Sequence, residues 1–222
     1  MTYLLLFLAV AAGYLIAILL KTKEIKRMSL YLAFSGAFLL AVTIFELLPE
    51  VFSTPTKNIG LFIMAGIMLQ IFLDFFSKGA EHGHVHLDLV DKSFPWLLFF
   101  SLSIHALLEG FPISEENNLL VGVIVHKIPI AVILSFFFIK ANYNKVNTLL
   151  FLGLFALMTP LGNWISNSFT FVELYKTEIN ALVIGIFLHV STTILFESSK
   201  DHKFNLAKLV TIILAIALAY FI

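Results

Sequence analysis

Two histidines and one glutamate lie in apolar stretches that rarely contain ionisable side chains. His105 and Glu109 are four residues apart, so a helix would place them on one face. His126 lies in the middle of the next apolar stretch. Ionisable groups at membrane depth rarely face lipid, so these two helices are expected to face each other. Imidazole and carboxylate suit zinc, iron, manganese or nickel, and the sequence therefore predicts a metal site at these three residues. The alternative is a buried His–Glu hydrogen bond that joins two helices.

Lys127 follows His126 directly and would bury an ammonium group in the same apolar stretch. A buried ammonium needs a counter-charge, and Glu109 is the nearest candidate. The pair would be either a structural salt bridge or a protein cation that stands in the place of a metal ion. The sequence leaves both interpretations open.

Two prolines are expected to interrupt the helices that carry these residues. Pro112 would remove the hydrogen bond to the carbonyl of Leu108, and Pro129 would remove the one to Val125. Irregular backbone at membrane depth is tolerated where it lines a cavity, so the two prolines favour a pathway through the protein. The alternative is a packing kink without a function.

Other polar residues are less diagnostic. Glu46 lies one turn before Glu50 and could line an access path, whereas Glu50 and Asp74 lie near the ends of apolar runs and are expected to be solvated. His189 is expected to be a packing residue with a hydrogen-bond partner. A polar loop contains three alternating histidines, His82, His84 and His86. Such short tracts can bind metals, although a solvated loop is an equal alternative.

The composition is that of a membrane protein. Of the 222 residues, 60% are hydrophobic and 13% are charged, whereas a soluble domain is about half apolar and about a quarter charged. The net charge of zero argues against a nucleic-acid partner. The absence of cysteine excludes disulfides and thiolate metal sites. The apolar N-terminus lacks a basic region and a cleavage site, so we expect a first spanning helix there.

Eight apolar runs have about the length that a helix needs to cross a bilayer. The sequence therefore predicts an all-α polytopic protein with eight transmembrane helices in a single membrane domain, residues 1–222. The predicted helices are residues 2–20, 28–51, 59–76, 94–113, 119–139, 146–168, 178–196 and 206–222. Carboxylates near the ends of the second and seventh helices suggest an inverted repeat around the fourth and fifth.

The distribution of basic residues predicts the orientation. Of the 14 Lys and Arg residues, 11 fall in loops on one side, 2 fall on the other, and Lys127 lies within the membrane. Loops rich in Lys and Arg face the cytoplasm. Both termini are therefore predicted to lie on the outer side, and the histidine-containing loop, residues 77–93, is predicted to be cytoplasmic.

These residues resemble the signature of the ZIP (ZRT/IRT-like) family of divalent metal transporters. The family pattern on helix four is similar to His-Asn-x-x-(Asp/Glu)-Gly, and here His105-Ala-Leu-Leu-Glu109-Gly110 differs only at its second position. On helix five the family pattern is similar to His-Glu-x-Pro-His-Glu, of which His126 and Pro129 remain. Two further motifs are similar, Glu46-Leu-Leu-Pro-Glu50 and Thr159-Pro-Leu-Gly162. The resemblance implies eight helices in a 3+2+3 arrangement with an inverted repeat.

The departures from the family pattern fall on one of its two metal positions. The residues that match this second position are Ala106, Lys127, Ile130 and Thr159. None of them is a good metal ligand, and Lys127 is a cation. The resemblance therefore implies at most a single metal, bound by His105, Glu109 and His126. Lys127 replaces the second metal, and the pathway would pass Glu46, Glu50, Lys127 and Thr159.

The residues and the resemblance together predict a divalent metal transporter and not an enzyme. Zinc is the leading substrate, ahead of iron and manganese, and would move toward the cytoplasm; no cofactor is expected. The expected partners are the metal ion and the lipid bilayer, the expected location is the cell (inner) membrane, and a homodimer is compatible with the sequence. Two alternatives stay open. One is a membrane-embedded metallohydrolase, because two histidines and a glutamate also form a catalytic zinc set. The other is a degenerate ZIP-like protein in which a Glu109–Lys127 pair replaces the metal.

Overall fold

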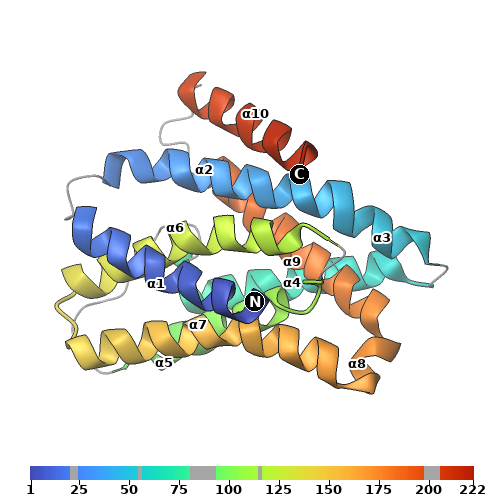
Figure 1. The fold of residues 1–222 in the computed structure, drawn as a ribbon, viewed down its shortest axis with the longest axis horizontal. Helices are drawn as coiled ribbons and strands as arrows, with labels where there is room; N and C mark the ends of the chain where they lie inside the picture. Colours follow the sequence, from blue (N-terminus) through green and yellow to red (C-terminus); the bar gives the residue numbers. More distant parts are fainter. Residues whose placement is uncertain (21–24, 55–56, 81–93, 115–116, 198–205) are drawn as a thin grey trace.

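The computed structural model of the chain is built from helices (Figure 1). It describes residues 1–20, 25–54, 57–80, 94–114, 117–197 and 206–222, and these ranges contain no strand. The elements in order are α1 (Thr2–Leu20), α2 (Ile25–Val42), the π-helix η1 (Thr43–Leu47), α3 (Leu48–Ser53), α4 (Ile59–Ser77), α5 (Trp96–Glu109), α6 (Leu119–Lys140), α7 (Lys145–Ser168), α8 (Thr170–Leu174), α9 (Lys176–Glu197) and α10 (Leu206–Tyr220). The histidines of the 77–93 loop, His82, His84 and His86, lie outside the described residues.

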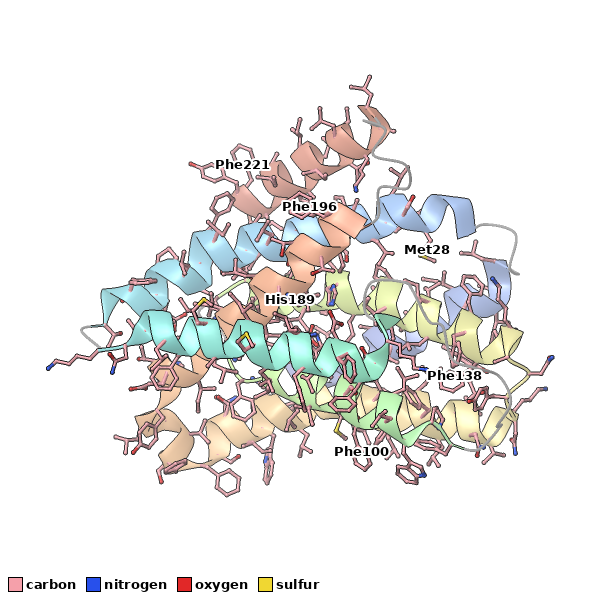
Figure 2. The ribbon with its side chains drawn as sticks, turned by 180° about the vertical axis from the view of Figure 1, so that it is seen from behind. Met28, Phe100, Phe138, His189, Phe196 and Phe221 are labelled. Atoms are coloured by element: carbon pink, nitrogen blue, oxygen red, sulfur yellow. The ribbon has the colours of Figure 1, made fainter. Side chains whose placement is uncertain are left out.

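Six helical segments of the described chain are long and apolar enough to cross a membrane. They are α1, the continuous stretch Met28–Ser53 that spans α2 to α3, α4, α6, α7 and Lys176–Phe196 of α9. Many large apolar side chains of the described chain are exposed on its outer surface, among them Phe100, Phe196 and Phe221 (Figure 2). An apolar outer surface over such helices is the surface of an integral membrane protein.

The remaining two apolar runs form shorter helices, α5 and α10. The 14 residues of α5 have a rise of about 21 Å, whereas the hydrocarbon core of a bilayer is about 30 Å thick. Each of the eight runs thus contains a helix, but only six meet the length of a full span. Eight spans in a 3+2+3 arrangement therefore stay a prediction.

The end of α5 corrects the prediction for Pro112. The helix ends at Glu109, and the next three residues form a turn. The amide of Phe111 donates to the carbonyl of Leu108 at 3.1 Å, so Pro112 does not free this carbonyl and the prediction was wrong. The physical reason is that a residue before proline avoids helical backbone, so the helix stops earlier. Pro129, in contrast, lies inside α6 as predicted.

Eight of the described helices divide into two groups of four. In the first group, α1 packs on α6 and α7, and α5 packs on α7. In the second group, α9 packs on α4 and α2, and α10 lies along α2 (Figure 1). The two groups meet where α2 packs on α6 and where α4 packs on α5. The functional candidates on α5 and α6 therefore belong to the first group and lie at its boundary with the second.

Glycines allow the closest helix crossings within each group. In the second group, a Cβ at Gly66 would overlap the backbone of Leu182, and Gly185 faces Gly66 from α9. In the first group, a Cβ at Gly162 of α7 would overlap the carbonyl of Leu107 on α5. Small residues at such crossings let backbones approach closely, which drives helix association in lipid. Each group is therefore held together by backbone contact as well as by side chains.

An aromatic cluster joins three helices of the first group. Phe151 of α7 has its ring centroid 4.8 Å from that of Phe138 on α6 and 5.4 Å from that of Phe99 on α5. Phe138 and Phe151 are fully buried. Aromatic pairs of this geometry contribute about 0.5–1.5 kcal/mol beyond area burial. The cluster therefore anchors α5 and α6 to the same face of α7.

The crossing of α5 and α7 makes a testable prediction about stability. Gly162→Ala should lower the melting temperature of the purified protein, because overpacking a tight contact costs about 1–3 kcal/mol. Gly153→Ala on the same helix is the matched control, because nothing lies within 4 Å of the position of its Cβ. That change should leave the melting temperature unchanged or slightly higher. Equal effects of the two substitutions would contradict the close crossing.

Candidate metal centre

The structure brings together the three predicted ligands. His105 and Glu109 come from one face of α5, as their spacing predicted, and His126 comes from the facing part of α6. One donor atom from each of the three residues lies within 4.8 Å of the others, and all three residues are buried. Among the described residues this is the single group of three or more histidine or acidic side chains arranged in this way. A group of donors this close together could hold one metal ion.

Lys127 forms an ion pair with the carboxylate of the cluster. Its Nζ donates to Oε2 of Glu109 at 2.6 Å, and both side chains are almost fully buried. The ammonium also lies 4.9 Å from the centre of the Phe155 ring, which favours a cation. Oε1 of Glu109 is buried and has no hydrogen-bond partner among the described residues. The carboxylate therefore uses one oxygen for Lys127, whereas the other has no hydrogen-bond partner among the described residues.

A small cavity lies at the centre of these side chains. His105, Glu109, His126 and Lys127 supply its polar wall, and the remaining wall is apolar, formed by Leu102, Ile130 and Phe155. Ile130 and Phe155 are buried. Apolar walls weaken solvent screening, so the charges in this cavity interact more strongly than they would in water.

Polar residues of α7 hold the end of α5 in place. Thr159 donates to the carbonyl of Ala106 at 2.8 Å, and its hydroxyl also lies 3.4 Å from Oε2 of Glu109. Asn163 and Ser166 donate to carbonyls in the turn that follows α5, at 2.6 Å and 2.8 Å. Helix ends leave carbonyls without intrahelical partners, and Thr159 satisfies one of them, whereas Asn163 and Ser166 bind carbonyls just beyond the helix. Thr159 is thus a support of Glu109. The spacing of Thr159, Asn163 and Ser166 on one face of an apolar helix was a signal for this role.

Each histidine contacts a polar side chain through Nδ1. His105 Nδ1 and Gln70 Oε1 of α4 are 3.0 Å apart, and Gln70 is fully buried. His126 Nδ1 lies 3.5 Å from Oγ of Ser35 on α2, which is also fully buried. Sequence reasoning did not assign either residue to the site. The signal for Gln70 was a lone amide deep in an otherwise apolar run.

The other predicted pathway residues lie apart from the cluster. Glu46, at the end of the π-helix, accepts hydrogen bonds from the backbone amide and the side chain of Asn118, at 2.7 Å and 3.0 Å. Asn118 is the residue before α6, where a carboxylate is stabilised by the positive end of the helix. Glu50 is exposed, as expected. Glu46 therefore lies at the start of α6, and neither carboxylate belongs to the cluster with His126.

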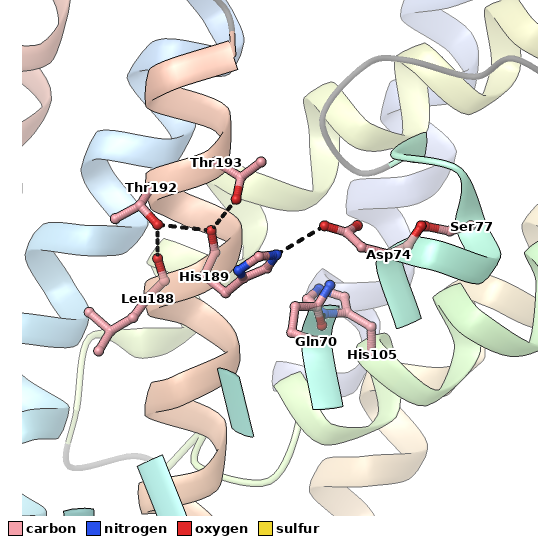
Figure 3. Close-up of polar contacts among 8 residues, drawn as sticks. All are labelled: Gln70, Asp74, Ser77, His105, Leu188, His189, Thr192 and Thr193. Carbon is pink, nitrogen blue, oxygen red and sulfur yellow. Dashed lines mark hydrogen bonds and ion pairs between the residues drawn. The ribbon is translucent and has the colours of Figure 1, made fainter. Parts of the chain in front are cut away.

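A second polar pair links α4 and α9 (Figure 3). Nε2 of His189 lies 3.1 Å from Oδ2 of Asp74, and the two side chains are 20% and 15% exposed. Thr192 and Thr193 donate to the carbonyl of His189. His189 thus has a partner, as expected for a packing residue, whereas Asp74 is much less solvated than predicted. Figure 3 also shows His105 beside Gln70. Gln70 lies one helical turn before Asp74 on α4.

Comparison with known proteins gives one distant similarity. No protein-family model matches the chain. The chain is 28% identical over 141 residues to a protein described as zinc transporter ZIP1 from Danio rerio. The match covers 58% of this chain and 45% of that protein, so the chain spans less than half of its relative's length. This partial similarity points to the same family as the four sequence motifs.

The buried ion pair makes a prediction that does not depend on metal. Lys127→Met should destabilise the protein by about 3–5 kcal/mol, because it leaves the carboxylate of Glu109 buried without a partner. The double variant Lys127→Met/Glu109→Gln should recover most of this loss, because it removes the unpaired charge. Thermal unfolding of both proteins in metal-free detergent solution measures the two changes.

The exposed Lys145 supplies the control for that experiment. Lys145→Met also removes one positive charge and should leave the melting temperature nearly unchanged. If Lys127→Met and Lys145→Met have the same melting temperature, Lys127 does not stabilise the buried carboxylate of Glu109.

Proposed function

We propose that this protein is a transporter of divalent metal ions, with zinc as its leading substrate. The observation that carries the proposal is the convergence of His105, Glu109 and His126, three buried donors from two neighbouring apolar helices. Ionisable side chains at membrane depth are rare, and substrate and ion pathways are among the functional sites that they mark. The distant similarity to a zinc transporter and the sequence motifs support the same function.

The centre would hold a single metal ion. The ammonium of Lys127 lies 2.6 Å from Oε2 of Glu109. A second dication would need this same oxygen as a ligand, and the ammonium already occupies the position next to it. A unit charge about 4 Å away contributes roughly 4 kcal/mol at an effective dielectric constant near 20. This repulsion opposes a second ion and weakens the first. Weak binding suits a transporter, because a site that holds its ion too tightly releases it slowly.

The ion pair would also support the empty state of the transporter. When the metal leaves, Glu109 would otherwise be a bare carboxylate in an apolar environment, which is unfavourable. Its bond with Lys127 satisfies Oε2 in this state, and Thr159 adds a second, longer contact. The oxygen Oε1 remains for the metal. The carboxylate can therefore bind metal without first breaking its contact with Lys127.

The packing of the helices supports a route for the metal. The family resemblance implies that helices one, four, five and six move together, and these correspond to α1, α5, α6 and α7, the first of the two packed groups. We propose that metal enters from the outer side, binds at the centre and leaves toward the loop with His82, His84 and His86. Both termini would then lie on the outer side of the cell membrane.

The short Lys127–Glu109 bond also favours a second candidate function. In this alternative the ion pair has replaced the metal altogether, and the chain is a ZIP-like protein without transport. The contact of the ammonium with the Phe155 ring supports it, because it gives Lys127 a settled position without a metal. Metal binding by the purified protein separates the two candidates directly.

We expect the purified protein to bind one zinc ion per chain. His105→Ala, Glu109→Ala and His126→Ala should each weaken binding by roughly 10-fold or more, since even the loss of a partner of a ligand costs about 10–100-fold. Affinity should rise with pH, because protons compete with the metal for the imidazoles. Isothermal titration gives the stoichiometry and the dissociation constant.

His189→Ala is the control, because His189 lies outside the cluster. Two tightly bound ions, or normal binding by any two of the three variants, would contradict the assignment.

Transport and the role of Lys127 are tested by zinc uptake into proteoliposomes. The wild type should take up zinc, and His105→Ala should not. Lys127→Glu should bind zinc more tightly and release it more slowly, because the charge that repels the ion has been removed. Zinc binding that is weaker in a well-folded Lys127→Glu protein would show that Lys127 supports the site. If the wild type neither binds nor transports metal, the second candidate function, a ZIP-like protein without transport, is the correct one.

A further inference from the structure

The contacts of the candidate ligands divide between the two helix groups. The carboxylate of Glu109 contacts Lys127 of α6 and Thr159 of α7, both in the first group, which also contains α5. The histidines contact the second group through Nδ1, His105 at Gln70 of α4 and His126 at Ser35 of α2. The carboxylate therefore belongs to a network within one group, whereas each imidazole is held across the boundary.

We propose that Gln70 is a positioning residue for His105, and that Ser35 assists it at His126, so that metal affinity depends on the relative position of the two helix groups. This inference rests on the proposed function, because it explains how the same centre would bind and release its ion. Neither residue is a metal ligand in this proposal. Each acts through the imidazole that it contacts.

The first step of the argument concerns the proton of His105. A neutral imidazole has one N–H donor and one nitrogen with a lone pair. Oε1 of Gln70 is a carbonyl oxygen and can only accept, so Nδ1 of His105 donates to it over 3.0 Å. The lone pair is then on Nε2. A ligating histidine commonly donates its other N–H in this way, which fixes its tautomer and ring orientation.

The second step concerns the place of Gln70. The side chain is fully buried, so water cannot replace His105 as the hydrogen-bond partner of its amide unless the helices rearrange. It lies on α4, where α4 packs on α5, and α4 itself is held by α9 through the Gly66–Gly185 crossing. Gln70 therefore belongs to the second group, whereas His105 belongs to the first.

A displacement between the groups then changes the metal site. If α5 and α6 shift relative to α2 and α4, the 3.0 Å contact of His105 and the 3.5 Å contact of His126 are lost together. Each imidazole then loses one contact that orients its ring, whereas Glu109 keeps its partners in the first group. Losing such outer contacts weakens metal binding by about 10–100-fold. The arrangement of the groups in this structure is thus the one that binds metal tightly.

The first test measures the tautomer of His105 in the metal-free protein. Nitrogen-15 NMR of the imidazole rings, at a pH where both histidines are neutral, distinguishes a proton on Nδ1 from one on Nε2. The wild type should have its His105 proton on Nδ1, and Gln70→Leu should move it largely to Nε2, the form preferred in water. His105→Ala assigns the signal. A wild-type His105 protonated on Nε2 would overturn the proposal.

The second test measures metal binding and the environment of the metal. Gln70→Leu should bind zinc about 10–100-fold more weakly than the wild type at the same stoichiometry. Bound Co²⁺ should show an altered visible absorption spectrum in this variant. Gln70→Glu should restore binding, because a carboxylate accepts the same hydrogen bond. A merely structural role of Gln70 would lower the melting temperature without changing the Co²⁺ spectrum, and would contradict the inference.

The serine contact has its own matched control. Ser35→Ala should weaken zinc binding, by less than Gln70→Leu because its contact is longer. Ser135→Ala should have no effect, because the hydroxyl of that buried serine on α6 donates only to its own helix, at Ala131. If the wild type binds no zinc, or if His105→Ala binds it normally, the proposed function fails. If the wild type binds zinc through His105 and Gln70→Leu binds it equally well, this inference alone fails.

Discussion

A carboxylate enclosed by apolar helices must have a positive partner close by, and the architecture around Glu109 follows from this constraint. Lys127 supplies the charge from α6, and the Phe155 ring of α7 supports the ammonium from its other side. For this pair to form, α5, α6 and α7 must be held in one register. The glycine crossing at Gly162 and the aromatic cluster around Phe151 provide that register. Removing either charge alone would leave the other buried without compensation, so the two residues constrain each other.

The spacing of ionisable residues predicted much of the centre. His105 and Glu109 share a face because they are one helical turn apart, and the rarity of charge in lipid predicted that His126 and Lys127 would turn toward them. Hydropathy also located every apolar run that contains a helix. The function of the centre stays a proposal.

The rest of the site depends on helix rotation, which an almost uniformly apolar sequence does not reveal. When all faces of a helix are apolar, periodicity does not indicate which side meets a neighbour. Gln70 and Ser35 could therefore not be assigned to the histidines before the packing of α4 on α5 and α2 on α6 was known. The end of α5 was missed for a related reason. Residues 111–113 continue the apolar run, and Gly110 and Pro112 are the signals that the helical backbone stops.

The early end of α5 has an electrostatic consequence for the kind of ion that the centre can accept. The peptide dipoles of a helix sum to about half a negative charge at its C-terminus. Because α5 stops at Glu109, this negative end lies beside the cavity instead of in the headgroup region. It adds to the charge of the carboxylate and stabilises the ammonium of Lys127. The end of this one short helix therefore contributes a potential that opposes an anion such as chloride and stabilises positive charge in the cavity.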